Sequence, residues 1–74
     1  MKTVSIHTEF IKLDQLLKFS GISATGSEAK ALILAENVRV NGEVCTMRGK
    51  KIRQGDTVEV GGETISVENP GPVQ

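Results

Sequence analysis

The pair Asn41-Gly42 constrains the fold of this chain more than any other short segment. Val38 and Val40 precede it with Arg39 between them, and Val44 follows it. Asn and Gly readily adopt the positive φ angles of a type I′ turn, which joins two antiparallel strands through a two-residue loop. The segment therefore predicts a β-hairpin in the middle of the chain.

Strand signals also occur towards both ends of the chain. Residues 3–8 alternate apolar and polar side chains, which predicts a first strand with one buried side. Gly55-Asp56 predicts a turn, and Gly61-Gly62 predicts the reversal of a second hairpin. Residues 47–51, between the two hairpins, are interpreted as a loop. The apolar residues that define these strands are Val4, Ile6, Val58, Val60, Ile65 and Val67.

The segment Lys12–Ser20 has the apolar spacing of a short helix, and Gly21 suits the left-handed position that follows a helix end. Two starting points are open. Thr8 caps an early beginning, or the helix begins near Lys12 with Asp14 in its first turn. The residues on its apolar face are Leu13, Leu16 and Leu17.

A second helix is predicted at about residues 26–36. Thr25 and Glu28 have the spacing of a capping box, in which each side chain binds a backbone N–H of the first turn. Residues 31–35 are apolar on all sides of the helix, so we expect this half to be covered on two sides. Only the N-terminal turn is then expected to meet water.

The length of 74 residues, the apolar content of 38% and the net charge of zero predict one small folded domain. A chain of this size buries only about 60% of its unfolded surface, which leaves little material to enclose a deep cleft. Phe10 and Phe19 are assigned to a core that is otherwise aliphatic. We expect an α+β domain over residues 1–68, with two helices packed on a small, mainly antiparallel sheet with hairpins. Residues 69–74, which contain Pro-Gly-Pro, are expected to be a frayed tail.

The single cysteine, Cys45, cannot close a disulfide within the chain, and a small secreted domain normally carries several. The first eight residues alternate in polarity and do not have the apolar stretch of an export signal. No apolar run approaches the roughly 18 residues of a membrane helix. These features predict a cytoplasmic protein with no membrane association.

The charges are segregated along the sequence although their sum is zero. Residues 1–53 hold nine basic and five acidic residues, a net charge of +4, and residues 54–74 hold four acidic residues and no basic one, a net charge of −4. Residues 48–53 contain four cations and no acid: Arg48, Lys50, Lys51 and Arg53. A solvated loop explains most clusters of this length. The other explanation is a site for phosphate groups, whose binding releases counterions.

The start of the second predicted helix is another candidate phosphate site. Its backbone N–H groups and positive dipole end attract anions, and Thr25, Ser27 and Lys30 add hydroxyl groups and charge. Ordinary capping by Thr25 and Glu28 explains the same residues, and the Glu28 carboxylate competes with an anion. Taken alone, this feature favours capping.

Several other functions are disfavoured. The chain has no Trp or Tyr on which single-stranded bases could stack. A helix-turn-helix DNA reader needs polar base-reading residues along its second helix, which is mostly alanine and leucine here. His7 and Cys45 are one histidine and one cysteine in predicted strands, too few for a zinc site and without a nucleophile-base arrangement. No catalytic residue, metal or cofactor is therefore predicted.

The ordered motifs of the chain resemble the αL RNA-binding module first known from small-subunit ribosomal protein four, over about residues 12–60. The short chain, together with residues 25–30 and 48–52, further resembles the bacterial standalone YbcJ/YaaA-type proteins, in which the module is nearly the whole protein. The residues that carry the resemblance are Lys12-Leu13-Asp14, Leu16, Leu17, Gly21-Ile22, Ser27-Glu28-Ala29-Lys30, Leu32-Ile33, Val38-Arg39-Val40-Asn41-Gly42, Gly55-Asp56, Val58 and Val60.

The chain departs from the broader family at two positions of the second helix. Gly26 stands where an arginine is usual, and Ala31 stands where a basic or polar residue is common. Both changes weaken that helix as a binding face, and the basic segment at 48–53 is expected to compensate. The predicted RNA contacts are Lys30, Arg48, Lys50, Lys51 and Arg53, with Lys12, Thr25, Ser27 and Arg39 as secondary members.

The resulting hypothesis is a non-catalytic RNA-binding protein that contacts structured RNA, of ribosomal or tRNA-like type, through phosphates and shape. DNA is disfavoured as a partner. The alternative is a protein-interaction module that docks its basic segment on an acidic partner in a ribonucleoprotein. The sequence leaves the oligomeric state, the cellular process and the identity of the RNA open.

Overall fold

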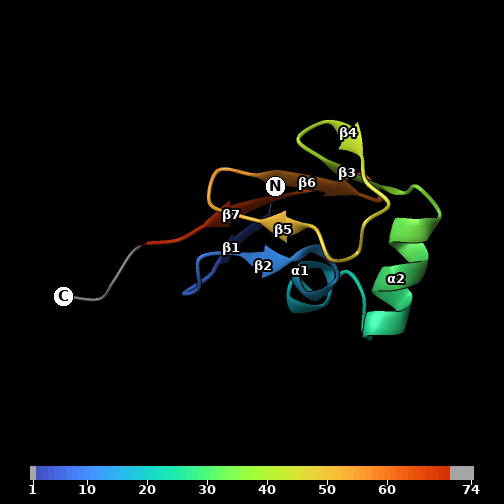
Figure 1. The fold of residues 1–74 in the computed structure, drawn as a ribbon, viewed down its shortest axis with the longest axis horizontal. Coiled ribbons are helices and arrows are strands. Elements are labelled where there is room, and N and C mark those ends of the chain that lie inside the picture. Colours follow the sequence, from blue (N-terminus) through green and yellow to red (C-terminus); the bar gives the residue numbers. More distant parts are fainter. Residues whose placement is uncertain (1, 71–74) are drawn as a thin grey trace.

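The computed structural model describes residues 2–70, which form two helices, a five-stranded sheet and a separate two-stranded sheet (Figure 1). The larger sheet has the strand order β1-β7-β6-β3-β4, and β2 pairs with β5 in the smaller one. All pairings are antiparallel except that of β1 with β7. The expected α+β class with a mainly antiparallel sheet is confirmed. The elements are β1 (Lys2–Ser5), β2 (Ile11–Lys12), α1 (Leu13–Phe19), α2 (Gly26–Leu34), β3 (Val38–Val40), β4 (Glu43–Val44), β5 (Lys51–Ile52), β6 (Thr57–Val60) and β7 (Glu63–Glu68).

Both predicted hairpin turns are present. Asn41 and Gly42 have φ angles of 51° and 86° between β3 and β4, and Gly61 and Gly62 have φ angles of 58° and 83° between β6 and β7. Positive φ at both central positions is the signature of type I′. The Asn41 side chain also reaches across to the start of β6, where its Oδ1 accepts a hydrogen bond from the Thr57 N–H at 2.9 Å.

Helix α1 begins at Leu13, which decides between the two predicted starts. Lys12 is the N-cap residue and makes no side-chain cap, whereas Thr8 donates its hydroxyl hydrogen to the Phe10 carbonyl at 2.7 Å. At the other end, Gly21 has a φ of 84° and donates its N–H to the Lys18 carbonyl, and Ile22 donates to the Leu17 carbonyl, both at 3.1 Å. These two bonds form a Schellman motif.

Helix α2 has the predicted cap but not the predicted burial. Thr25 Oγ1 accepts the Glu28 N–H at 3.2 Å, and the Glu28 carboxylate accepts the N–H of Ala24, one residue before the N-cap. The expectation that residues 31–35 are covered on two sides is wrong, because Leu34 is 58% exposed. The helix lies at one end of the molecule, so only its Ala29 and Ile33 face is fully buried (Figure 1).

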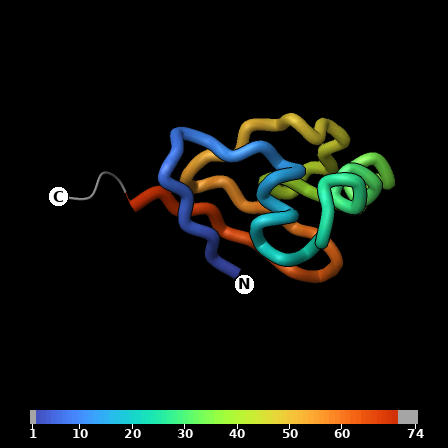
Figure 2. The backbone as a smooth tube through the Cα atoms, turned by 90° about the horizontal axis from the view of Figure 1, so that it is seen from below, coloured from blue at the N-terminus to red at the C-terminus, as the bar shows by residue number. Residues whose placement is uncertain are grey.

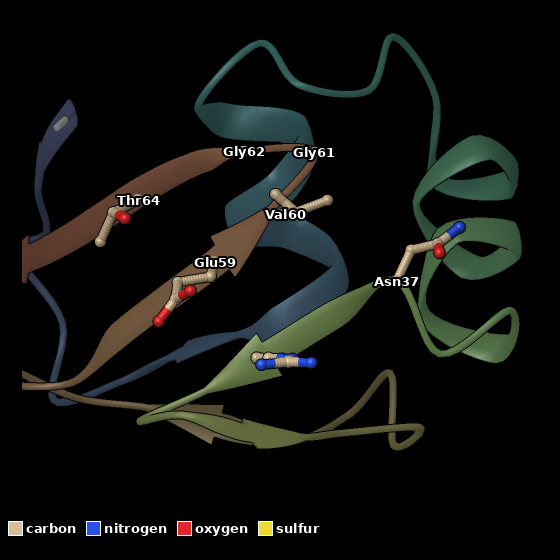
Figure 3. Close-up of a pocket in the computed structure, with 7 residues that line it drawn as sticks. Asn37, Glu59, Val60, Gly61, Gly62 and Thr64 are labelled. Carbon is tan, nitrogen blue, oxygen red and sulfur yellow. The ribbon is translucent and has the colours of Figure 1, made fainter.

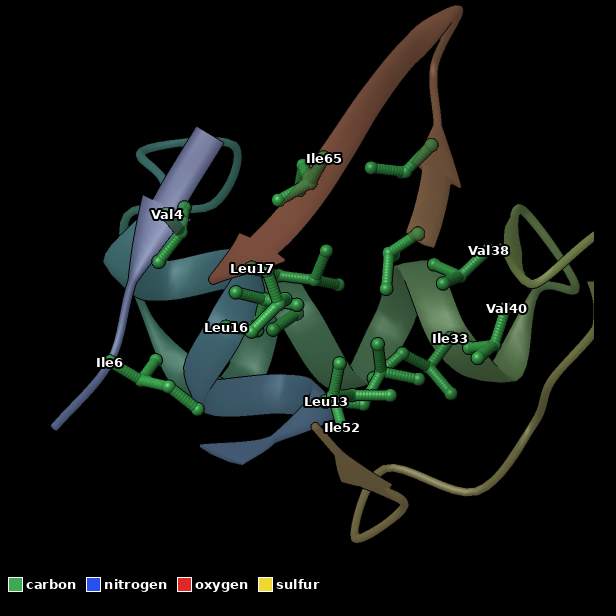
Figure 4. Close-up of a cluster of buried hydrophobic side chains, with 14 residues drawn as sticks. Val4, Ile6, Leu13, Leu16, Leu17, Ile33, Val38, Val40, Ile52 and Ile65 are labelled. Atoms are coloured by element: carbon green, nitrogen blue, oxygen red, sulfur yellow. The ribbon is translucent and has the colours of Figure 1, made fainter. Parts of the chain in front are cut away.

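The core is formed by aliphatic side chains from both helices and from both sheets (Figure 4). Burial alternates along the strands, so the helices cover one face of the larger sheet and leave the other open. The assignment of the aromatic residues to the core is wrong for Phe19, which is 69% exposed beyond the last buried turn of α1, and Phe10 is only half-buried. The buried apolar residues are Val4, Ile6, Leu13, Leu16, Leu17, Ala29, Ile33, Val38, Val40, Ile52, Val58, Val60, Ile65 and Val67.

The smaller sheet was not predicted. Residues 47–51 were interpreted as a loop, but Lys51 and Ile52 form β5 and pair with β2. Each of these strands has two residues, too few to show a periodic pattern. The first strand is also shorter than expected and ends at Ser5, although Ile6 beyond it is buried.

Of the tail predicted at 69–74, residues 71–74 lie outside the described residues. Asn69 donates a side-chain hydrogen bond to the Thr8 carbonyl at 2.9 Å, which ties the end of β7 to the segment after β1. Within residues 2–70, neither helix has the length and apolar character required to span a bilayer.

Candidate nucleic-acid interface

Five exposed cations lie on or next to the two-stranded sheet formed by β2 and β5. We call this group the basic ribbon: Lys12, Arg48, Lys50, Lys51 and Arg53. Four of them come from one segment of sequence, whereas Lys12 joins them only because β2 pairs with β5. The fold therefore combines the strongest predicted cluster with one of the secondary candidates.

The backbone of the basic ribbon is held against the start of α1. The N–H of Leu13 donates to the Lys50 carbonyl at 2.9 Å, and the N–H of Asp14 donates to the Arg48 carbonyl at 3.1 Å. First-turn N–H groups have no partner inside their own helix, so these carbonyls satisfy donors that α1 would otherwise leave free. The helix thus fixes the backbone of the segment that carries the cations.

The smaller sheet has one buried face and one charged face. Ile11 pairs with Ile52, which is fully buried beside Leu13, and Lys12 pairs with Lys51, both of which are exposed. Successive strand residues point to opposite faces. The buried Ile52 and the half-buried Ile11 face the core, so the two lysines face solvent.

The cations of the basic ribbon have few internal partners. Lys51 Nζ lies 4.9 Å from the centroid of the Phe10 ring, a cation-π contact. The nearby Asp56 carboxylate already accepts the Arg53 backbone N–H at 2.8 Å and the Asn41 side-chain amide at 3.1 Å. In the part of the chain that the structure describes, no carboxylate forms an ion pair with any of the five cations. Their charge is available to an external anion.

The N-terminal end of α2 is exposed at Thr25, Gly26 and Ser27. The Thr25 hydroxyl oxygen already caps this helix by accepting the Glu28 N–H. The Glu28 carboxylate already accepts the N–H of Ala24, the residue before Thr25. Ser27 has no side-chain hydrogen bond within residues 2–70. The sequence-based preference for capping at this helix end agrees with these contacts.

Lys30 is exposed on one flank of α2. Leu32, on the other flank, lines a shallow hollow with Ile22 and Asn37. Helical residues advance by about 100° each, so Lys30 and Leu32 lie on opposite sides of the buried Ala29. Figure 2 views α2 nearly along its axis and shows the α1–α2 connection on one side and the β4–β5 segment on the other. Lys30 therefore lies on the flank of α2 away from this hollow.

Arg39 is separated from the basic ribbon. It lies in β3 between the buried Val38 and Val40, so it points to the open face of the larger sheet, where Glu59 is its cross-strand neighbour. A pocket of about 190 Å³ on that face is lined by Arg39 and by the labelled residues of Figure 3. The structure does not bring this predicted contact together with the others.

The histidine and the cysteine lie in different parts of the fold. His7 is exposed after β1, and Cys45, half-buried after β4, donates its thiol hydrogen to the Met47 carbonyl at 3.7 Å. Among the residues from 2 to 70, no group of three or more His, Cys, Asp or Glu side chains is placed to hold a metal ion.

The place of one residue beside the candidate interface was not predicted from the sequence. Phe10 was assigned to the core, but its ring supports Lys51. A Phe directly before a strand that carries Lys12 is compatible with this role, yet the relevant lysine is 41 positions away in the sequence. Only knowledge of the β2–β5 pairing identifies the contact.

Comparison with known proteins gives consistent matches along nearly the whole chain. Residues 4–68 match the model of the S4 domain family. The probable ribosome maturation protein RlbA of Bacillus subtilis strain 168 is 41% identical over 59 residues, which cover 80% of this chain and 83% of the relative. The YbcJ protein of Escherichia coli strain K12 is 39% identical over 57 residues, which cover 77% of this chain and 81% of the relative.

A solved structure also has this arrangement of helices and strands. The solution structure of YbcJ from E. coli, described as containing an αL motif involved in RNA binding, superposes with a TM-score of 0.72 at 36% sequence identity. The superposition covers 92% of this chain and 87% of that protein.

Proposed function

The chain belongs to the S4 domain family, and from this membership we propose that it is a non-catalytic RNA-binding protein that contacts structured RNA through backbone phosphates and shape. The YbcJ relative, with its αL motif described as involved in RNA binding, supports the choice of RNA. The name of the B. subtilis relative, a probable ribosome maturation protein, favours ribosomal RNA among structured RNAs. We extend the proposal to the bacterial cytoplasm because both relatives are bacterial.

The basic ribbon is the observation that carries this proposal. Its five exposed cations form no ion pair with a described carboxylate, and the bonds to α1 fix their backbone before any ligand arrives. A preordered cluster loses less conformational entropy on binding than a flexible loop. Each phosphate that it neutralises also releases condensed counterions, which favours association at low salt.

The distribution of aromatic rings supports recognition of phosphates and shape. Stacking platforms for single strands place several exposed rings in succession. Here Lys51 lies over the Phe10 ring, and Phe19 is at the end of α1 opposite to the basic ribbon. One isolated exposed ring does not form a platform, so a folded RNA with a defined arrangement of phosphates fits the surface better.

The test is a fluorescence-anisotropy titration of the protein against an RNA hairpin and a DNA duplex of equal length at several salt concentrations. We expect tighter binding to the RNA, and log affinity should decrease with log salt by roughly 0.7 to 0.9 per neutralised phosphate. The double variant Arg48→Gln with Lys50→Gln should bind the RNA at least tenfold more weakly. A loss of this size is on the order of one phosphate contact or more.

The matched control is Lys18→Gln, an exposed lysine of α1 outside the basic ribbon, which should bind as the unchanged protein does. Absence of binding to structured RNA at low salt would refute the proposal. Retention of the same protein partners after nuclease treatment, with no direct RNA binding, would favour docking on an acidic protein instead.

A further inference from the structure

Lys12 and Lys51 occupy the position of closest approach between β2 and β5. They are register partners in an antiparallel pair, and the next pair contains the bond from the Leu13 N–H to the Lys50 carbonyl. Hydrogen-bonded and non-hydrogen-bonded pairs alternate along such a ladder, so Lys12 and Lys51 form a non-hydrogen-bonded pair. In this type of pair the Cα atoms are about 4.5 Å apart, and the side chains start closer together than in the other type.

This arrangement is unfavourable for the isolated protein. Like charges directly opposite each other destabilise a strand pair. Neither lysine has an ion pair with a carboxylate within residues 2–70. The buried Ile52, the half-buried Ile11 and the bonds to α1 hold the register, so the two ammonium groups cannot separate by a shift of the strands.

Phe10 restricts the position of one of the two ammonium groups. Lys51 Nζ lies over its ring at 4.9 Å from the centroid, and the Phe10 carbonyl is held by the Thr8 hydroxyl. A ring can attract a cation without neutralising its charge. The contact therefore limits the conformations of the Lys51 side chain and leaves it available to an anion.

We propose that Lys12 and Lys51 together bind one phosphate group of the RNA, with Phe10 as the positioning residue for Lys51. This inference rests on the proposed RNA-binding function and assigns one phosphate to one pair of residues. An anion with several oxygens can accept from both ammonium groups at once, and its charge removes the repulsion between them. Conflict between stability and binding is characteristic of functional sites.

A double-mutant cycle tests whether the two lysines share a phosphate. The proteins are the unchanged chain, Lys12→Gln, Lys51→Gln and the double variant, each titrated with the same RNA hairpin at low salt. Each single substitution is expected to weaken binding about fivefold to tenfold, and the double variant should be only slightly weaker than either. Losses that multiply in the double variant would refute a shared phosphate.

Thermal unfolding without RNA gives an independent readout. Lys12→Gln should raise the melting temperature by roughly 2–4 °C at low salt, since it removes the repulsion from Lys51. The same substitution should have almost no effect in the Lys51→Gln background. An equal change of the melting temperature in both backgrounds would refute the coupling between the two charges. A lower melting temperature of Lys12→Gln in the otherwise unchanged protein would refute the repulsion.

Phe10→Leu tests the positioning role because it retains an apolar side chain and removes the aromatic face. We expect about a twofold to threefold loss of RNA affinity when Lys51 is present, and no loss in the Lys51→Gln background. Phe10→Tyr should retain the affinity. An equal loss in both backgrounds would show a structural effect and refute the role.

The Arg48→Gln with Lys50→Gln variant separates the two levels of the proposal. If it weakens RNA binding while the Lys12 and Lys51 variants do not, the shared phosphate is refuted and RNA binding through the rest of the basic ribbon stands. If the unchanged protein does not bind RNA at all, the proposed function is refuted, and this inference with it.

Discussion

Replacement of Asn41 should separate the two structural roles of this residue. Asn41 adopts a φ of 51° in the turn after β3, and its side chain joins this turn to the start of β6. The Asn41 Oδ1 accepts the Thr57 N–H at 2.9 Å, and its Nδ2 donates to the Asp56 carboxylate at 3.1 Å. The same carboxylate accepts the Arg53 backbone N–H, so the contact continues into the basic ribbon.

The expected loss in the free energy of unfolding is the sum of two contributions, one from hydrogen bonds and one from backbone strain. Asn41→Gly retains easy access to positive φ and loses three side-chain hydrogen bonds. The two shorter ones are worth about 0.5–1 kcal/mol each in this exposed setting, and the bond from the Thr57 hydroxyl, at 3.4 Å, adds little. Asn41→Ala loses the same bonds and also places a Cβ in the left-handed region, which costs roughly another 1 kcal/mol. We therefore expect losses of about 1–2 kcal/mol for glycine and about 2–3 kcal/mol for alanine.

Urea denaturation followed by circular dichroism at 25 °C measures both values. A domain of this size has an unfolding free energy of roughly 4–11 kcal/mol, so both variants should remain folded and show a lower midpoint with an unchanged slope. If alanine destabilises no more than glycine, the argument from backbone strain is wrong. If glycine costs nothing, the side-chain bonds to Asp56 and Thr57 do not stabilise the fold.

Three further substitutions test other parts of the structure. Ile52→Ala should cost about 2–4 kcal/mol in chemical denaturation, because Ile52 is fully buried and anchors the smaller sheet; a loss below 1 kcal/mol would contradict that anchoring. Leu34→Gln should change the midpoint of thermal unfolding little, within about 0.5 kcal/mol, since Leu34 is 58% exposed; a larger loss would indicate that α2 is covered after all. Gly21→Ala should lower the free energy of unfolding by about 1 kcal/mol in thermal unfolding. No atom clashes with an added Cβ at this position, but the φ of 84° disfavours one. An unchanged or higher stability would show that this strain is absent.

Basic and acidic residues that are separated along the sequence also lie on different parts of the folded domain. The basic ribbon lies on the side of the larger sheet that packs against the helices, because β5 contributes Ile52 to the same core. Glu59 lies on the open face, opposite Arg39, and the acidic residues Glu63 and Glu68 are at the two ends of β7. If RNA binds as proposed, this distribution favours one orientation of the protein on a polyanion.

Part of the candidate site was predictable and part was not. The cluster at 48–53 was visible because four cations in six residues need no knowledge of the fold. The partnership of Lys12 with Lys51 and the role of Phe10 were not visible, since they depend on a pairing across about 40 residues of sequence. The structure places Arg39, one of the contact residues that we predicted, on the open face of the larger sheet, and the part of every predicted residue in binding stays a prediction.

The sequence by itself determined the local elements: two hairpin turns, the cap of α2, the glycine that ends α1, and the alternation that buries one face of the larger sheet. These features depend on φ preferences and on periodic polarity within a few residues. Tertiary structure alone decided that β2 pairs with β5, that carbonyls of the basic segment satisfy the first N–H groups of α1, and that Leu34 and Phe19 remain exposed. Such outcomes depend on which distant segments meet, and a two-residue strand or an apolar helix end has no local pattern that specifies its partner.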